Sequence, residues 1–116
     1  MSNAEQGSYL SGYRIMWMVV MFDLPVDTKA ARRAATKFRE HLLDLGFEMS
    51  QFSVYARFCN GRDQFDAYAK KIESGLPGTG DVHILHFTDR QYENIIRYSG
   101  RTRGEARQKP GQLALF

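Results

Sequence analysis

One carboxylate, Asp23, stands where it could do chemistry. Eight consecutive apolar residues, 15–22, precede it, and Pro25 follows two positions later. A run this short cannot cross a bilayer, and it predicts a strand buried on both faces. Proline has no N–H to donate to a sheet, so the strand must end near Asp23. Because an isolated buried charge is costly, we expect the carboxylate at an edge, where it meets water, a metal or a cation.

The residues alone leave two interpretations of Asp23 open. In the structural one, it caps the following helix or forms a salt bridge with Lys29 or Arg32. In the functional one, it is a catalytic ligand of Mg²⁺, with Mn²⁺ as an alternative, because magnesium often binds through one or two carboxylates and keeps its waters. Two such aspartates related by a dimer axis make a better site than one. Nearby Lys and Arg would then hold a nucleic-acid backbone for metal-assisted phosphodiester hydrolysis.

The other reactive residue types show no catalytic pattern. His41, His83 and His86 lack metal-ligand spacing on one helix, and the last two, three apart in a predicted strand, point to opposite faces. Cys59 is the single cysteine, which excludes an intrachain disulfide and fits a reducing compartment. We therefore predict a cytoplasmic protein and a structural or inert Cys59.

The elements that must position Asp23 follow one another in the order β-α-β-β-α-β. Asp27 or Thr28 can cap a helix that Gly46 ends, and a phase shift at residues 50–51 divides an alternating segment, 47–58, into two strands or a bent hairpin. A second helix over 63–74 and strands over 81–87 and 95–98 follow. The order predicts an α+β, ferredoxin-like fold: an antiparallel sheet with both helices on one face and an extra C-terminal strand.

The chain of 116 residues is long enough for one core. We divide it into a disordered extension (1–12, in part like a cloning remnant), one domain (13–98) and a flexible basic tail (99–116). Residues 97–109 hold four Arg, one Lys and one Glu, a composition that is commonly solvated but also suits contact with a polyanion or an acidic protein. No segment predicts a membrane partner.

The first strand also predicts a partner. If both helices lie on one side of the sheet, the other face exposes Trp17, Val19 and Met21, or their neighbours. A face this apolar normally needs a cover. We therefore predict a homodimer that packs sheet on sheet.

Two segments resemble a known family. Residues 19–25, Val-Val-Met-Phe-Asp-Leu-Pro, and residues 51–55, Gln-Phe-Ser-Val-Tyr, are similar to the small CRISPR-associated adaptation protein, CRISPR-associated protein two. The resemblance covers roughly residues 14–98. Each motif is weak alone, but the two are fairly specific in combination with this chain length.

The resemblance implies a ferredoxin-like homodimer placed between two dimers of the CRISPR adaptation integrase, where the assembly holds duplex DNA. Asp23 matches the family aspartate proposed to bind a divalent metal across the dimer. The basic residues Lys29, Arg32, Arg33 and Lys37 lie in the following region, which we assign to nucleic-acid binding. Metal-dependent nuclease activity on single-stranded RNA or duplex DNA is ascribed to several members, whereas spacer acquisition itself resembles a structural role.

Two other function classes compete with this interpretation. The same element order serves RNA recognition motifs, which read bases with exposed aromatics on the sheet face. The segment 51–58 has such aromatics but lacks the basic residue and glycine that open the usual signature. A metabolite-sensing or structural dimerisation domain would bind no nucleic acid and would leave Asp23 as a cap.

Overall fold

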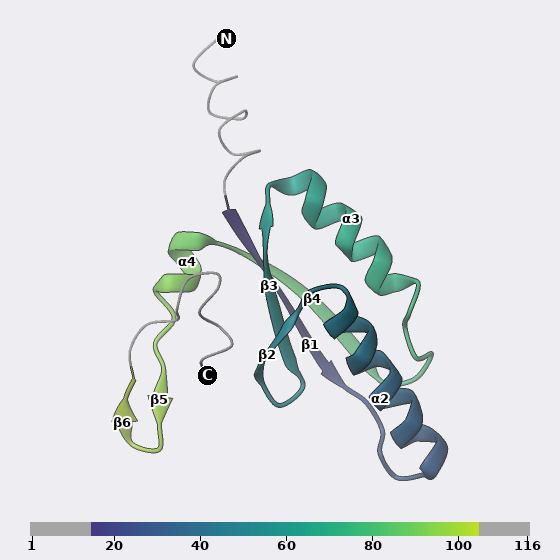
Figure 1. The fold of residues 1–116 in the computed structure, drawn as a ribbon. Helices are drawn as coiled ribbons and strands as arrows, with labels where there is room; N and C mark the ends of the chain where they lie inside the picture. The colour runs from purple at the N-terminus through teal and green to yellow at the C-terminus, as the bar shows by residue number, and fades with distance from the viewer. Residues whose placement is uncertain (1–14, 105–116) are drawn as a thin grey trace.

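The fold, a computed structural model, is described for residues 15–104 (Figure 1). The predicted extension, 1–12, and most of the predicted tail lie outside the described residues. The elements, in chain order, are β1 (Ile15–Asp23), α2 (Lys29–Asp44), β2 (Glu48–Gln51), β3 (Val54–Asn60), α3 (Arg62–Glu73), β4 (Asp81–Thr88), α4 (Asp89–Glu93), β5 (Tyr98–Ser99) and β6 (Thr102–Arg103).

The first four strands form one antiparallel sheet in the order β2-β3-β1-β4. The apolar strand β1 therefore has a hydrogen-bonded neighbour on each side, which confirms its predicted central position. The two long helices, α2 and α3, lie together on one side of the sheet in Figure 1. This arrangement confirms the α+β, ferredoxin-like prediction.

Local signals account for both ends of α2. The hydroxyl of Thr28 accepts a hydrogen bond from the backbone N–H of Ala31 at 3.0 Å, so Thr28, one of the two predicted caps, is the N-cap. Gly46 follows the last turn with a φ of +87°, a conformation that favours glycine. Phe38 and Leu42 are buried on the inner face of the helix, as the spacing predicts.

Removing the cap gives the first testable prediction. Thr28→Ala leaves a backbone N–H of the first helical turn without its partner, so we expect unfolding free energy to fall by about 1 kcal/mol. Urea denaturation followed by circular dichroism measures the change. Thr28→Ser, which keeps the hydroxyl, is the matched control. Equal losses in both variants would contradict the capping role.

The main core lies between the sheet and the two long helices. Alternate residues of β1, Met18 and Val20, are fully buried there against Phe38 and Leu42 of α2. Phe22 continues the same face and packs edge-on against Phe38, with ring centroids 5.3 Å apart. From α3 and the strands come Phe65, Ile72, Tyr55 and Cys59.

The opposite face of the sheet differs from the prediction. Trp17 and Val19 are buried, at 0% and 7% exposure, because the short helix α4 covers them. The ring of Tyr92 stacks on Trp17 with centroids 4.0 Å apart, and Trp17 Nε1 donates to Asp89 Oδ1 at 3.0 Å. The expectation that this face lies bare was therefore wrong for Trp17 and Val19, and it holds for Met21, which is 42% exposed.

An extra C-terminal strand is present, as predicted, but it lies at Tyr98–Ser99 rather than over residues 95–98. Before it, directly after β4, a capping box between Thr88 and Gln91 starts the short helix α4, a signal that the alternating pattern of β4 obscured. The chain then forms a separate hairpin in which β5 pairs with β6 rather than with the main sheet. In Figure 1 this hairpin and α4 lie on the side of the sheet away from α2 and α3.

Candidate functional site

The end of β1 presents Asp23 as the strand geometry predicts. Asp23 is exposed, and its carboxylate makes no hydrogen bond or ion pair within residues 15–104. Thr28 caps α2 instead, and Arg32 donates to the backbone oxygen of Val26 at 3.0 Å. Neither proposed structural role of Asp23 is thus observed, and its carboxylate remains accessible to a ligand.

A second carboxylate stands directly opposite Asp23. In the antiparallel register of β1 with β4, Asp23 pairs with Asp81 and Met21 pairs with His83. Cross-strand partners project from the same face with Cβ atoms roughly 4.5–5.5 Å apart. The two aspartates and His83 therefore share the face that also carries Trp17. All three side chains are exposed.

These side chains line one hollow of about 360 Å³ at the end of the sheet. Like charges directly opposite on neighbouring strands destabilise a sheet, so this pair favours a bound cation. In the described part of the chain no cluster of three or more His, Cys, Asp or Glu side chains is placed to hold a metal. The carboxylates of Asp23 and Asp81 therefore fit a metal ion that binds to few protein ligands and keeps waters in its other positions. The lining residues are Met21, Phe22, Asp23, Phe52, Ser53, Val54, Asp81 and His83.

Sequence reasoning missed Asp81 and His83 as members of the site. Asp81 opens the predicted strand 81–87, and an antiparallel neighbour of β1 must begin where β1 ends. The sequence does not show that β1 and β4 are neighbours in the sheet, because each of them could also have paired with other strands. His83 lacks ligand spacing along the sequence, so no local signal marks it as part of a site.

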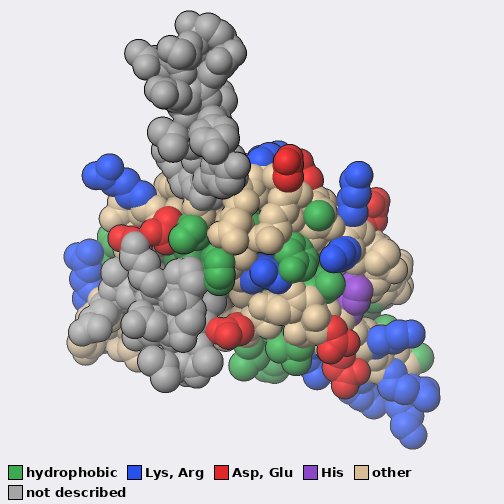
Figure 2. Space-filling model, turned by 45° about the horizontal axis from the view of Figure 1, so that its top comes forward, with side chains coloured by type: hydrophobic (Ala, Val, Ile, Leu, Met, Phe, Trp, Pro, Cys, Tyr) green, Lys and Arg blue, Asp and Glu red, His purple; other side chains and the backbone are tan. Residues whose placement is uncertain are grey.

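The predicted nucleic-acid-binding residues gather on the outer face of α2. All four are exposed and line one shallow surface hollow together with Thr36 and Glu40. Figure 2 shows Lys and Arg side chains concentrated at the lower right, where Figure 1 places the start of α2. This surface is separate from the hollow of Asp23. Its basic members are Lys29, Arg32, Arg33 and Lys37.

Cys59 is fully buried in the main core. Burial raises the pKa of its thiol, and the nearby Arg57 guanidinium acts in the opposite direction. The thiol therefore stays protonated and out of reach of a substrate. His86 is directed to the α3 side of the sheet, against Phe65, so His83 and His86 do point to opposite faces, as predicted.

Comparison with known proteins agrees with this architecture. The sequence model of the family described as CRISPR associated protein Cas2 matches residues 16–95. The chain belongs to the Cas2 family. It is 59% identical to the CRISPR-associated endoribonuclease Cas2 of Paracidovorax avenae, over 92% of this chain and 99% of that one. Proteins of the same name from Flavobacterium psychrophilum (38% identical, 97% of each chain) and Parvibaculum lavamentivorans (43%, 87% of this chain and 100% of that one) are also similar.

The Cas2 match extends from β1 through α4 and so includes Asp23, Asp81 and the basic face of α2. It ends before the β5–β6 hairpin. The family resemblance drawn from residues 19–25 and 51–55 is thereby confirmed. No helix in residues 15–104 is long and apolar enough to span a bilayer.

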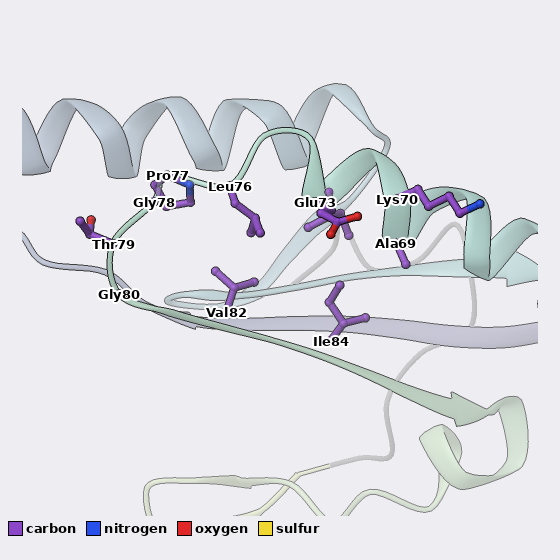
Figure 3. Close-up of a pocket in the computed structure, with 11 residues that line it drawn as sticks. Ala69, Lys70, Glu73, Leu76, Pro77, Gly78, Thr79, Gly80, Val82 and Ile84 are labelled. Atoms are coloured by element: carbon purple, nitrogen blue, oxygen red, sulfur yellow. The ribbon is translucent and has the colours of Figure 1, made fainter.

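A further hollow of about 530 Å³ lies between the end of α3, the loop to β4 and β4 itself. Figure 3 shows Leu76 directed toward Val82 and Ile84 within it, while Lys70 extends away. The lining is mainly apolar, and Lys70 and Glu73 are the charged residues in it. None of the predicted site residues contributes to this hollow.

The face that an RNA recognition motif would use is largely covered. Such a module stacks bases on aromatics of its central strands, on the side away from the helices. Here the corresponding aromatic of β1, Trp17, is fully buried beneath Tyr92. Tyr55 of β3 is buried on the helix side. The burial of these rings argues against the RNA-recognition alternative.

Proposed function

We propose that this Cas2-family chain is a metal-dependent endonuclease of CRISPR adaptation, which acts as a homodimer. The observation that carries the proposal is the pair of exposed carboxylates, Asp23 and Asp81, facing each other at the end of the central strand. The names of its relatives, CRISPR-associated endoribonucleases, support phosphodiester hydrolysis as the reaction class.

The residues present fit Mg²⁺. Magnesium commonly binds through one or two carboxylates and retains several waters, which suits a pair of exposed aspartates without a third ligand. Asp23 and Asp81 would hold the ion, and Mn²⁺ would suit the same oxygen donors. When bound, the ion supplies Lewis-acid activation of the phosphate and of a coordinated water.

The chain's own residues have separate tasks in this scheme. Asp23 and Asp81 would hold the ion, and their place at the end of β1 and β4 would set where the reacting phosphate binds. His83, on the same face two residues beyond Asp81, is placed to exchange a proton with water in the hollow. The lysines and arginines of α2 hold the nucleic-acid backbone by charge.

The homodimer forms, in this proposal, through the sheet face opposite α2 and α3. Met21, at 42% exposure, lines a small apolar hollow of about 140 Å³ on this face beside the α4 cover. Packing two copies here would bring their Asp23 residues toward a common axis. The exposed β5–β6 hairpin and the tail beyond it are the segments we assign to contacts with the second copy or with the adaptation integrase, and the dimer would also hold duplex DNA.

The test measures cleavage and oligomeric state together. Full-length protein is incubated with 5′-labelled single-stranded RNA or duplex DNA in Mg²⁺, in Mn²⁺ or in EDTA, and its mass is measured by light scattering after gel filtration. We expect a dimer that cuts with either ion and not in EDTA. A monomer, or cleavage that persists in EDTA, would refute the proposal. A dimer that binds duplex DNA without cutting would limit the function to a scaffold.

The basic face of α2 gives a separate prediction. Arg33→Gln removes one phosphate contact, so we expect affinity to fall similarly for all sequences and the slope of log K against log salt to lose about one. Fluorescence anisotropy from 50 to 200 mM salt measures both. Lys70→Gln on α3 removes the same charge away from the α2 face. An unchanged slope for Arg33→Gln, or an equal change for Lys70→Gln, would contradict the assignment.

A further inference from the structure

Phe52, in the tight turn between β2 and β3, is the most exposed large apolar side chain among the described residues. It is 85% exposed, whereas the next, Tyr98, is 62% exposed. Burial of apolar surface drives folding, so a ring left this open contributes little to the stability of the monomer. The same residue lines the hollow that holds Asp23 and Asp81. An aromatic ring therefore borders the two carboxylates.

The turn holds Phe52 in a defined place beside the carboxylates. The backbone N–H of Phe22, the residue before Asp23, donates to the backbone oxygen of Ser53 at 3.1 Å. Ser53 itself has a φ of +62°, a left-handed conformation that side chains other than glycine rarely adopt. Strained residues of this kind concentrate where a binding site needs a fixed geometry. The end of β1 thus positions Asp23 and Phe52 relative to one another.

We propose that Phe52 is a stacking platform for an unpaired nucleobase next to the phosphodiester held at Asp23 and Asp81. This inference rests on the proposed function and specifies its substrate class. The hollow of about 360 Å³ falls within the range of roughly 300–1,000 Å³ common for ligand pockets. Aromatic rings stack on bases with little regard to sequence, because every base has a π-face.

The inference selects single-stranded over duplex nucleic acid for the cleavage site. Within a duplex, both faces of a base are already stacked on its neighbours, so none is free to cover the ring of Phe52. A base in a single strand or a loop can be displaced onto an aromatic side chain. In Figure 1, the turn, the end of β1 and the start of α2 all lie toward the same end of the sheet. One strand can therefore contact the basic face of α2 as it enters the hollow.

The experiment uses the full chain and an RNA of mixed sequence that carries one 5-iodouridine, with Ca²⁺ in place of Mg²⁺ so that the two carboxylates still hold an ion. Irradiation links the modified base to a stacked aromatic ring, and mass spectrometry locates the linked residue. We expect linkage at Phe52. Phe52→Leu should lose it and bind single-stranded RNA about tenfold more weakly, while duplex DNA binding stays unchanged. Phe52→Tyr should restore both the linkage at residue 52 and the affinity for single-stranded RNA. Leu76→Ala removes an exposed apolar side chain from the loop after α3, away from the hollow of Asp23 and from the basic face of α2, and is the matched control.

The outcomes separate this inference from the function on which it rests. If wild-type protein binds single-stranded RNA and Phe52→Leu matches it in affinity and linkage, the stacking role is refuted while the nuclease proposal stands. If Phe52→Leu becomes monomeric and loses RNA and duplex binding equally, Phe52 is a dimer contact and the inference is also refuted. If wild-type protein binds neither nucleic acid, the proposed function fails and the inference fails with it.

Discussion

Asp23→Asn is expected to lower the Mg²⁺-dependent cleavage rate by about a thousandfold, because a metal ion supplies several kcal/mol of transition-state stabilisation. The amide keeps the size of the side chain but loses the charge that binds the ion. Asp23 is exposed and has no partner in residues 15–104, so the fold should not change. Single-turnover cleavage of labelled RNA measures the rate, and circular dichroism checks the fold.

The companion variants identify which carboxylate matters. Asp81→Asn should reduce cleavage as well, since it removes the residue directly opposite Asp23. Asp44→Asn, at the exposed end of α2, removes the same charge away from the site and should leave the rate unchanged. Nucleic-acid binding should persist in all three variants. Cleavage by Asp23→Asn at the wild-type rate would exclude the metal-ligand role, and the aspartate would then be vestigial.

Trp17→Ala is expected to cost about 3–5 kcal/mol of unfolding free energy, the usual range for truncating a buried aromatic. Trp17 is fully buried, stacks on Tyr92 and donates to Asp89. Alanine at this position leaves a cavity beneath Tyr92 and removes the hydrogen bond to Asp89, and both of these contacts hold α4 on the sheet. We expect α4 to detach and the underlying apolar face to become exposed. Because the chain has one tryptophan, unfolding must be followed by circular dichroism rather than by tryptophan fluorescence.

Trp17→Phe distinguishes the two contributions of this residue. Phenylalanine can still stack on Tyr92 but cannot donate to Asp89, so it should lose less stability than alanine. Binding of a hydrophobic dye reports exposure of the face. Leu76→Ala, at an exposed position of the loop after α3, should change neither unfolding free energy nor dye binding. A loss below 1 kcal/mol for Trp17→Ala would mean that α4 does not contribute to the fold in the way its contacts indicate.

The fold followed closely from local patterns. The apolar run of β1, the apolar stripe of α2 between Thr28 and Gly46, and the alternation of β4 each specify an element from neighbouring residues alone. Their order then restricts the topology to a split βαβ arrangement. The helix α4 escaped prediction because five residues are too few for a helical period to be visible. Its presence overturned the expectation that Trp17 and Val19 lie bare.

The sequence by itself determined that a carboxylate, Asp23, stands at the end of a buried strand, since an apolar run and a proline leave it no other place. Only the tertiary structure decided what surrounds it. Asp81, His83 and Phe52 reach Asp23 through strand pairing and a turn, and such pairing depends on which distant segments bury each other's apolar faces. Strand pairing depends on segments far apart in the sequence, so the residues next to Asp23 in the sequence could not show which side chains surround it.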